Sequence, residues 1–171
     1  GLIGLAGWLY WQNRQVAASG ETGAQFTAAL DTMAASRPKA AMREVDPIAK
    51  GTQPTYRALA LMVQGDAALA DDEHAAAAHF AQLARDQNAP QVLRDIALLR
   101  QTLAEYDSLQ PAQVIDRLKP LVDKAGPAFP LAAELTALAE LRRGNNRVAG
   151  QLYKRISEAP DVPDTLKSRA V

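Results

Sequence analysis

The sequence contains no cysteine and few aromatic residues, and both shortages narrow the classes of protein it can belong to. Without cysteine the chain forms no disulfide, carries no thiolate nucleophile and offers no sulfur ligand for zinc. Aromatic residues make up only 5% of the chain, whereas hydrophobic residues make up 48%. The core must therefore be built from Ala, Leu, Val and Ile. No segment alternates polar and apolar residues in the way that predicts a strand, and we expect an all-α protein.

A surplus of positive charge is also missing. The chain has 19 basic and 19 acidic residues, and its formal net charge is zero. Proteins that bind nucleic acid usually carry a basic surplus that neutralises phosphates, so we expect no nucleic-acid partner. The length of 171 residues suits one ordinary domain or a short solenoid.

Regularly spaced prolines reveal a repeat. Pro54, Pro90, Pro127 and Pro160 are separated by 36, 37 and 33 residues. Turn-like clusters lie midway between them, at residues 37–38, 71–72, 109–111 and 144–146. A repeat of about 34 residues, made of a helix, a tight turn and a second helix, is the tetratricopeptide period. The pattern predicts an α-solenoid of about four helical hairpins.

Apolar residues at spacings of three and four predict the helices and their buried sides. We expect helices over 15–36, from Pro38 to about 50, and over 55–70 and 73–87. We also expect one helix on each side of the turn at 108–111, one on each side of the break at 144–145, and a last helix over 165–171. The stripes expected to face the core include Phe26, Leu30 and Met33; Val92, Ile96, Leu99, Leu103 and Tyr106; and Leu131, Leu135 and Leu138. Pro47 and Pro120 should kink or shorten their helices, and Asp71 or Asp72 should cap the helix that follows.

The first eleven residues, GLIGLAGWLYW, carry no charge. As a helix they would cover about 17 Å, roughly half of a bilayer core. Trp8, Tyr10 and Trp11 cluster at one end like an interfacial aromatic belt, and a polar run follows at once. We expect residues 1–14 to be the end of an N-terminal transmembrane helix and 15–171 to be the repeat domain. A helix end packed in the core and a signal peptide are the alternatives.

Several phrases resemble a known family. Ala76 and Phe80 stand where tetratricopeptide units place a small residue and then an aromatic one, and residues 60–90 read like a degenerate unit. With GWLYWQNRQ, YRALALM and LRDIALLRQ, the whole chain resembles the tetratricopeptide-like domain of the ancillary Sec translocon subunit family, which is related to a cell-division coordinator. The resemblance implies a single-pass protein of the bacterial inner membrane with its repeats in the periplasm. It also implies protein partners, namely translocon subunits or a membrane-bound chaperone.

Residues that could carry catalysis or bind a metal are sparse. His74 and His79 are five apart, which leaves them about 140° apart around a helix, unsuited to sharing a metal. Asp71, Asp72 and Glu73 lack the loop of a calcium site, and no glycine-rich phosphate loop is present. We expect no cofactor, no metal and no enzymatic activity.

Polar residues on the first helices of two hairpins are candidates for binding a partner. Arg57 and Gln64 lie seven apart on one helix, away from its apolar stripe, and Arg94 and Gln101 repeat this spacing on the next. Such a groove would bind an extended peptide or a helix through hydrogen bonds; ordinary solvation of a polar face is the alternative. Arg142 and Arg143 fit a role at the negative end of a helix dipole.

The leading functional hypothesis is a membrane-anchored periplasmic scaffold for protein–protein interaction, ancillary to the Sec translocon and to chaperoning of envelope proteins. An accessory subunit of another inner-membrane complex, such as a respiratory assembly, is an alternative. So is a periplasmic cell-division coordinator, and an enzyme whose site is assembled from distant residues is the weakest.

Overall fold

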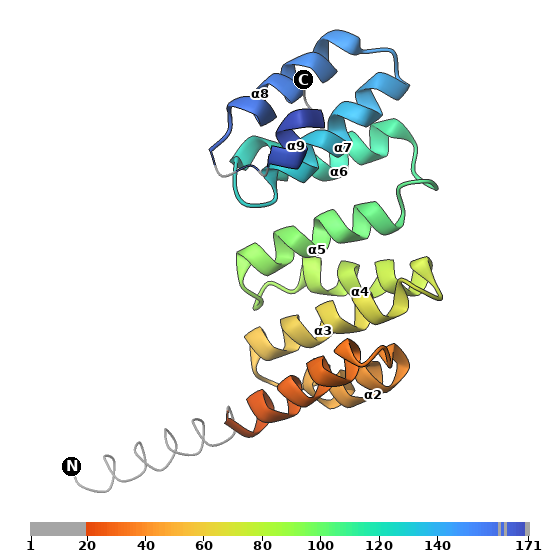
Figure 1. The fold of residues 1–171 in the computed structure, drawn as a ribbon, viewed down its shortest axis with the longest axis vertical. Helices are drawn as coiled ribbons and strands as arrows, with labels where there is room; N and C mark the ends of the chain where they lie inside the picture. Colours follow the sequence, from red (N-terminus) through yellow and green to blue (C-terminus); the bar gives the residue numbers. More distant parts are fainter. Residues whose placement is uncertain (1–19, 161, 163, 170–171) are drawn as a thin grey trace, which may run out of the picture.

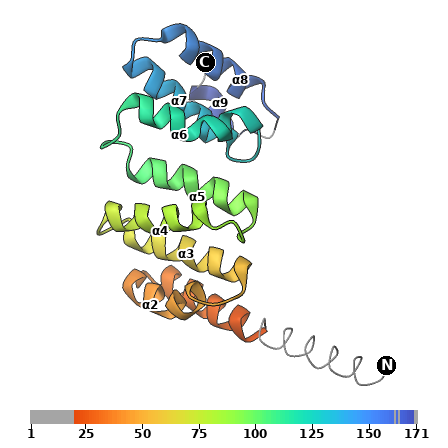
Figure 2. The same cartoon turned by 180° about the vertical axis from the view of Figure 1, so that it is seen from behind.

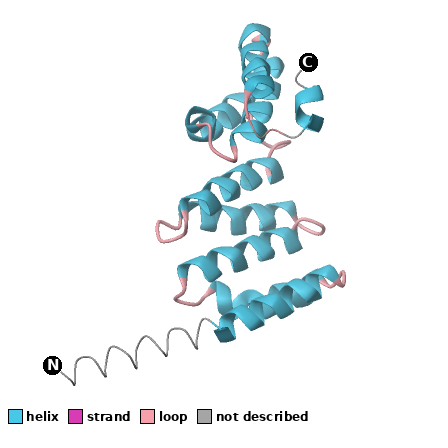
Figure 3. Cartoon of the chain, turned by 60° about the vertical axis from the view of Figure 1, so that its left-hand side comes forward, coloured by secondary structure: helices cyan, strands magenta, loops and turns pink. Residues whose placement is uncertain are grey.

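The computed structural model describes residues 20–160, 162 and 164–169, and every regular element within these ranges is a helix (Figure 3). Residues 20–34 form the first helix. The others are α2 (Pro38–Ala49), α3 (Pro54–Ala68), α4 (Glu73–Arg85), α5 (Gln91–Ala104), α6 (Pro111–Lys124), α7 (Phe129–Arg142), α8 (Asn146–Glu158) and α9 (Asp164–Arg169). The expected all-α architecture is confirmed for this part of the chain.

The helices stack in chain order, so that each lies against its neighbours in sequence (Figures 1 and 2). Pairs of helices form four hairpins: 20–34 with α2, α3 with α4, α5 with α6, and α7 with α8. The short α9 lies beside the α7–α8 hairpin (Figure 1). We call the leading helix of each pair its first helix.

Proline and aspartate set the helix ends much as their chemistry predicts. Pro38, Pro54 and Pro111 each stand at the first position of a helix, where a missing N–H costs nothing. Asp72 caps α4, its Oδ1 accepting a hydrogen bond of 2.9 Å from the N–H of Ala75. The last helix begins at Asp164, one residue earlier than expected.

The expected shortening by proline is wrong for α6. This helix contains Pro120 but continues to Lys124, and α2 likewise contains Pro47 but continues to Ala49. Both prolines lie in or next to the final turn. A proline there removes one hydrogen bond and leaves few later residues to be displaced, so regular helix persists to the end.

The third hairpin is the loosest, although its sequence pattern is the most regular. α5 packs extensively on α4 and α6 on α7, but α5 and α6 touch sparsely. The buried residues accordingly divide within α5: Ala97 belongs to the core of the preceding helices and Leu99 to that of the following ones. Polar links supplement the junction, including the ion pair of Arg117 with Glu105.

The expected buried sides of the first helices need correction. Leu30 is exposed while its neighbour Ala29 is fully buried. Val92 and Leu103, at the two ends of the expected stripe of α5, are each 46% exposed. On α7, Leu135 is buried as expected, but Leu131 is 42% and Leu138 39% exposed. Four of the eight buried residues of this helix are alanines: Ala132, Ala133, Ala137 and Ala139.

The physical reason is the distance between helices. A helix that lies between two neighbours packs closest where its side chains are smallest, and alanine permits the shortest approach. Alanine and leucine are both apolar, so a pattern of apolar residues does not distinguish the two orientations. Most of the alanines are buried in the stack, whereas Leu30, Leu103, Leu131 and Leu138 turn outward.

Candidate functional site

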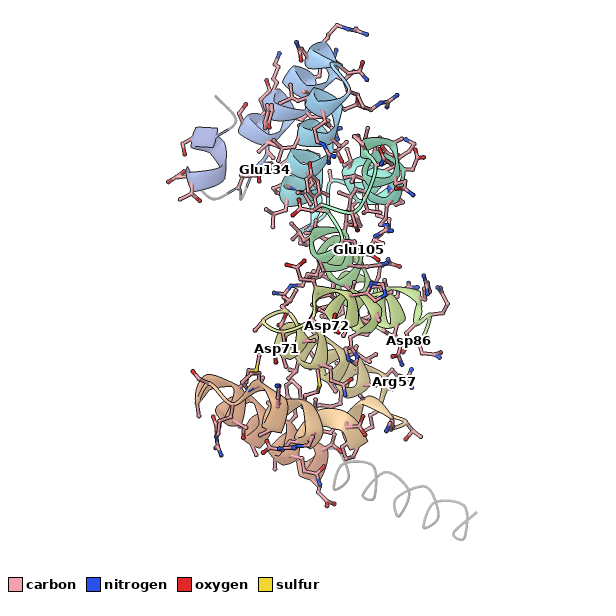
Figure 4. All side chains as sticks on the ribbon, turned by 90° about the vertical axis from the view of Figure 1, so that its right-hand side faces the viewer. Arg57, Asp71, Asp72, Asp86, Glu105 and Glu134 are labelled. Carbon is pink, nitrogen blue, oxygen red and sulfur yellow. The ribbon has the colours of Figure 1, made fainter. Side chains whose placement is uncertain are left out.

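Arg57, the first of the four residues expected to bind a partner, is engaged within the protein. Its Nε and Nη2 donate hydrogen bonds of 2.9 and 2.6 Å to Oδ2 of Asp86, which lies in the loop after α4. The two side chains are only 22% and 14% exposed, and they lie together at one edge of the stack (Figure 4). Burial tends to raise the pKa of Asp86. The hydrogen bonds from Arg57, Asn88 and Ala89 outweigh that effect, and the pKa of Asp86 is lowered.

Gln64 and Gln101 are buried, with 5% and 9% of their surface exposed. Nε2 of Gln64 lies 3.4 Å from Oδ1 of Asp46 on α2, and Nε2 of Gln101 donates to Glu105 at 3.2 Å. Both amides therefore satisfy hydrogen bonds inside the array. In this structure neither is available to line an open groove, and a direct role in binding would require the helices to separate.

Arg94 keeps unused hydrogen-bonding capacity. Its Nη1 donates 2.8 Å to Oε1 of Gln87, and Nη2 donates to Gln91. Its Nε is buried and has no hydrogen-bond partner. Among the described residues no hydrogen bond or ion pair joins Arg94 to Arg57, Gln64 or Gln101, so polar contacts do not link the four residues into one site. That any of them binds a partner stays a prediction.

A different surface emerges from the exposed apolar side chains. Seven large apolar residues are exposed in the described part of the chain: Leu30, Leu69, Val92, Leu103, Leu131, Leu138 and Leu141. Every one lies on the first helix of a hairpin or, for Leu69, at the C-cap of α3. The second helices α2, α4, α6 and α8 contribute none. Exposed apolar residues mark a surface suited to protein contact where they lie close together.

The α7 helix holds the densest part of this surface. Leu131, Leu138 and Leu141 are 42%, 39% and 42% exposed. Their spacings of seven and three place them within about 80° of one another around the helix. Arg142 lies on the same side, with its guanidinium carbon 5.7 Å from the centre of the Tyr106 ring. We call these four residues the α7 patch. Leu131 and Leu138 were expected to face the core, and Arg142 was assigned only a role at the helix dipole.

Two clefts accompany these surfaces. The larger, about 650 Å³, lies between the α6–α7 loop and the end of α8, and includes Pro127, Phe129, Arg155 and Pro160. Arg155 stacks on Phe129, 4.9 Å from the ring centre, and its Nη2 donates 2.9 Å to the carbonyl of Val122. The smaller, about 190 Å³, includes Thr22, Gln53 and Tyr56.

The two histidines differ in their exposure to solvent. His74 is exposed at the start of α4, whereas His79 is half-buried. Burial lowers the pKa of His79, and the charge of Asp46 opposes the effect only in part. Within the described residues no group of three or more His, Asp or Glu side chains is placed to hold a metal ion.

The residues expected at a membrane interface, Trp8, Tyr10 and Trp11, lie outside the described ranges. Among the helices that are described, none combines the length and the hydropathy required to cross a bilayer.

Stacked helical hairpins of about 34 residues with an exposed surface on the first helices define an α-solenoid built for contact with other molecules. A family model described as a tetratricopeptide repeat-like domain matches residues 1–130. The match covers most of the 171 residues, and the chain belongs to this family. No curated protein and no solved structure matches the chain.

Proposed function

We propose that this protein is a membrane-anchored scaffold of the bacterial inner membrane, with its repeat domain in the periplasm. Its task would be to bind proteins beside the Sec translocon and to assist the chaperoning of envelope proteins, without catalysis. Membership of the tetratricopeptide repeat-like family supports a role in protein–protein contact, since such solenoids generally offer extended binding surfaces.

The observation that carries the binding role is the distribution of exposed apolar residues. All seven large ones in the described ranges lie on first helices or their caps. In a polar environment each exposed leucine has an unfavourable contact with water, and covering it with a partner removes that cost. Single exposed leucines are common on protein surfaces; what points to binding is their absence from the described second helices α2, α4, α6 and α8.

The location rests on the beginning of the sequence. Residues 1–11 are uncharged and end in the aromatic cluster of Trp8, Tyr10 and Trp11, and the family match begins at residue 1. An apolar run followed by aromatic and then polar residues is typical of the end of a transmembrane helix. The resemblance to the ancillary Sec translocon subunits supports the periplasmic side and the choice of partners.

The experiment is affinity purification of the tagged protein from membranes solubilised in a mild detergent, followed by mass spectrometry. Co-purification of translocon subunits or envelope chaperones would support the proposal. The variant with Leu103→Ser, Leu138→Ser and Leu141→Ser serves as the negative control. It should remain folded, but the translocon subunits and chaperones should no longer co-purify with it. If neither translocon subunits nor envelope chaperones co-purify, the translocon role is refuted. Co-migration with a respiratory or transport complex on a native gel would show instead an accessory subunit.

A further inference from the structure

The described helices divide into two packed units between α5 and α6. The helices α2 to α5 pack extensively on one another in chain order, and so do α6, α7 and α8, whereas α5 and α6 touch sparsely. The apolar clusters divide at the same place. Two clusters lie wholly before residue 98, and the third begins there. We call the helix over 20–34 and α2 to α5 the first unit, and α6 to α9 the second unit.

Apolar contact between the units comes from α5 and from the loop that follows it. Leu98 and Leu99 on α5, and Tyr106 and Leu109 in the loop, join the cluster of the second unit. Two packed bodies that share a small interface are expected to move relative to each other, because little buried surface opposes the motion. These contacts therefore attach the second unit to the first without fixing the angle between them.

Two ion pairs cross the junction, and in both the acidic residue is on the side of the first unit. Arg117 on α6 pairs with Glu105, the C-cap residue of α5. Lys124, at the end of α6, lies 3.6 Å from Asp95 on α5. Gln101 donates 3.2 Å to Glu105 and so holds this carboxylate in position. The two carboxylates are ten residues apart in sequence, about 15 Å along a helix, so the pairs hold α6 at two separate points.

The net charge also changes sign at the junction. Residues 1–110 contain 9 basic and 12 acidic side chains, whereas residues 111–171 contain 10 basic and 7 acidic ones. The two parts thus carry formal charges of −3 and +3 in a chain that is neutral overall. Opposite charges attract the units to each other, and dissolved salt weakens this attraction.

We propose that the α5–α6 junction is a salt-sensitive hinge. The two ion pairs hold the units at one angle when the ionic strength is low, and the units rotate about residues 105–110 when the charges are screened. The side chains of Arg117 and Glu105 are 25% and 24% exposed, so dissolved ions reach them. Rotation would change the orientation of α7 relative to α3. The hinge goes beyond the proposed function, because it is a motion within the chain that needs no particular partner.

The test measures the distance between the units by single-molecule fluorescence energy transfer, with the full chain in a non-ionic detergent. Because the chain has no cysteine, dyes can be attached to two introduced ones. Ala78→Cys and Gln151→Cys, at exposed positions on α4 and α8, form a pair that spans the junction. Ala28→Cys and Ala78→Cys form a control pair within the first unit.

The salt concentration is raised from about 0.01 M to about 1 M sodium chloride, which shortens the Debye length from about 30 Å to about 3 Å. The distribution of transfer efficiency should become wider for the pair that spans the junction and stay unchanged for the control pair. Salt screens charges but does not weaken apolar burial, so this result would identify the ion pairs as the restraint.

Substitutions at the junction make the test specific. Arg117→Gln with Lys124→Gln should give the wide distribution already at low salt. Lys119→Gln with Lys154→Gln is the matched control, because it removes the same charge from the second unit but only pairs within single helices. It should keep the narrow distribution. Glu105→Arg with Arg117→Glu restores an ion pair of reversed direction and should give a narrower distribution than either change alone. Far-ultraviolet circular dichroism should show equal helix content in all of them.

Three results would overturn the hinge. The first is a distribution for the pair across the junction that salt leaves unchanged. The second is equal widening for both dye pairs, because salt would then loosen the whole array. The third is a distribution for Arg117→Gln with Lys124→Gln that is no wider than that of its matched control. The salt titration requires no substitution in α5 or α6, so it decides the question even if a junction variant unfolds.

Discussion

Replacing Gly65 by alanine should destabilise the protein, although alanine is the better helix former. Gly65 is buried within α3, where alanine in place of glycine would ordinarily stabilise a helix by about 0.8–1.0 kcal/mol. A Cβ atom at this position would lie 2.3, 2.6 and 2.7 Å from three carbons of the Phe80 ring. Ordinary contact between carbon atoms is about 3.5–4.0 Å, so the ring would have to move by more than an ångström.

Phe80 has little room to move. Its side chain is fully buried in a cluster with Ala68 and Ala76. The guanidinium of Arg100 lies 5.4 Å from its ring centre and is also paired with Asp66. Overpacking of this kind costs typically about 1–3 kcal/mol. Because the ring is enclosed, we expect the upper part of this range, about 2–3 kcal/mol. After the gain in helix propensity is subtracted, the net loss is about 1–2 kcal/mol, or roughly 2–8 °C in the midpoint of thermal unfolding.

Thermal unfolding followed by circular dichroism at 222 nm measures this effect, and Gly150→Ala is the matched control. Gly150 lies within α8, and a Cβ there would meet nothing within 4 Å. The control should raise the unfolding midpoint through helix propensity alone. The double variant Gly65→Ala/Phe80→Leu should lose less stability than the sum of its single changes, since the clash is with the ring. A Gly65→Ala variant as stable as the parent would refute the close packing of α3 and α4.

Three further changes test other parts of the structure. Asp72→Ala should lower the free energy of unfolding by about 1 kcal/mol in urea denaturation, because α4 loses its side-chain cap. The pKa of Asp86 in the folded protein is lowered from its ordinary value of 3.8. The ionised side chain therefore stabilises the fold above pH 3.8, and this stabilisation is lost as the pH falls below that value. Asp86→Asn should flatten this acidic part of the stability–pH profile. Ala29→Leu should destabilise by about 1–3 kcal/mol through overpacking. Leu30→Ala should cost only about 1 kcal/mol, because Leu30 is 43% exposed. Equal effects at these two positions would contradict the orientation of the first helix.

The positions of the helices followed from local chemistry and could be predicted from the sequence. Proline at the first position of a helix, aspartate at its cap and spacing near 34 residues depend on neighbouring residues alone. The predicted helix over residues 73–87 and the observed Glu73–Arg85 agree within two residues. Burial of Leu99, at the centre of its predicted apolar stripe, also followed from the sequence.

The candidate site was harder to predict because it depends on which side of each first helix faces inward. Gln64 and Gln101 read as exposed polar residues, but both are buried against neighbouring carboxylates. Leu103 and Leu138 read as core residues, but both are exposed. In an alanine-rich helix several sides are apolar, and hydrophobicity by itself favours none of them strongly.

The sequence by itself determined an all-α solenoid, its turns and its repeat length, since propensity, capping and period act over a few residues at a time. Only the tertiary structure decided the rotation of each first helix about its axis. Close packing between helices selects small side chains for the contacts, because a large one would hold the helices apart. The leucines that remain outside form the surface on which a partner can bind.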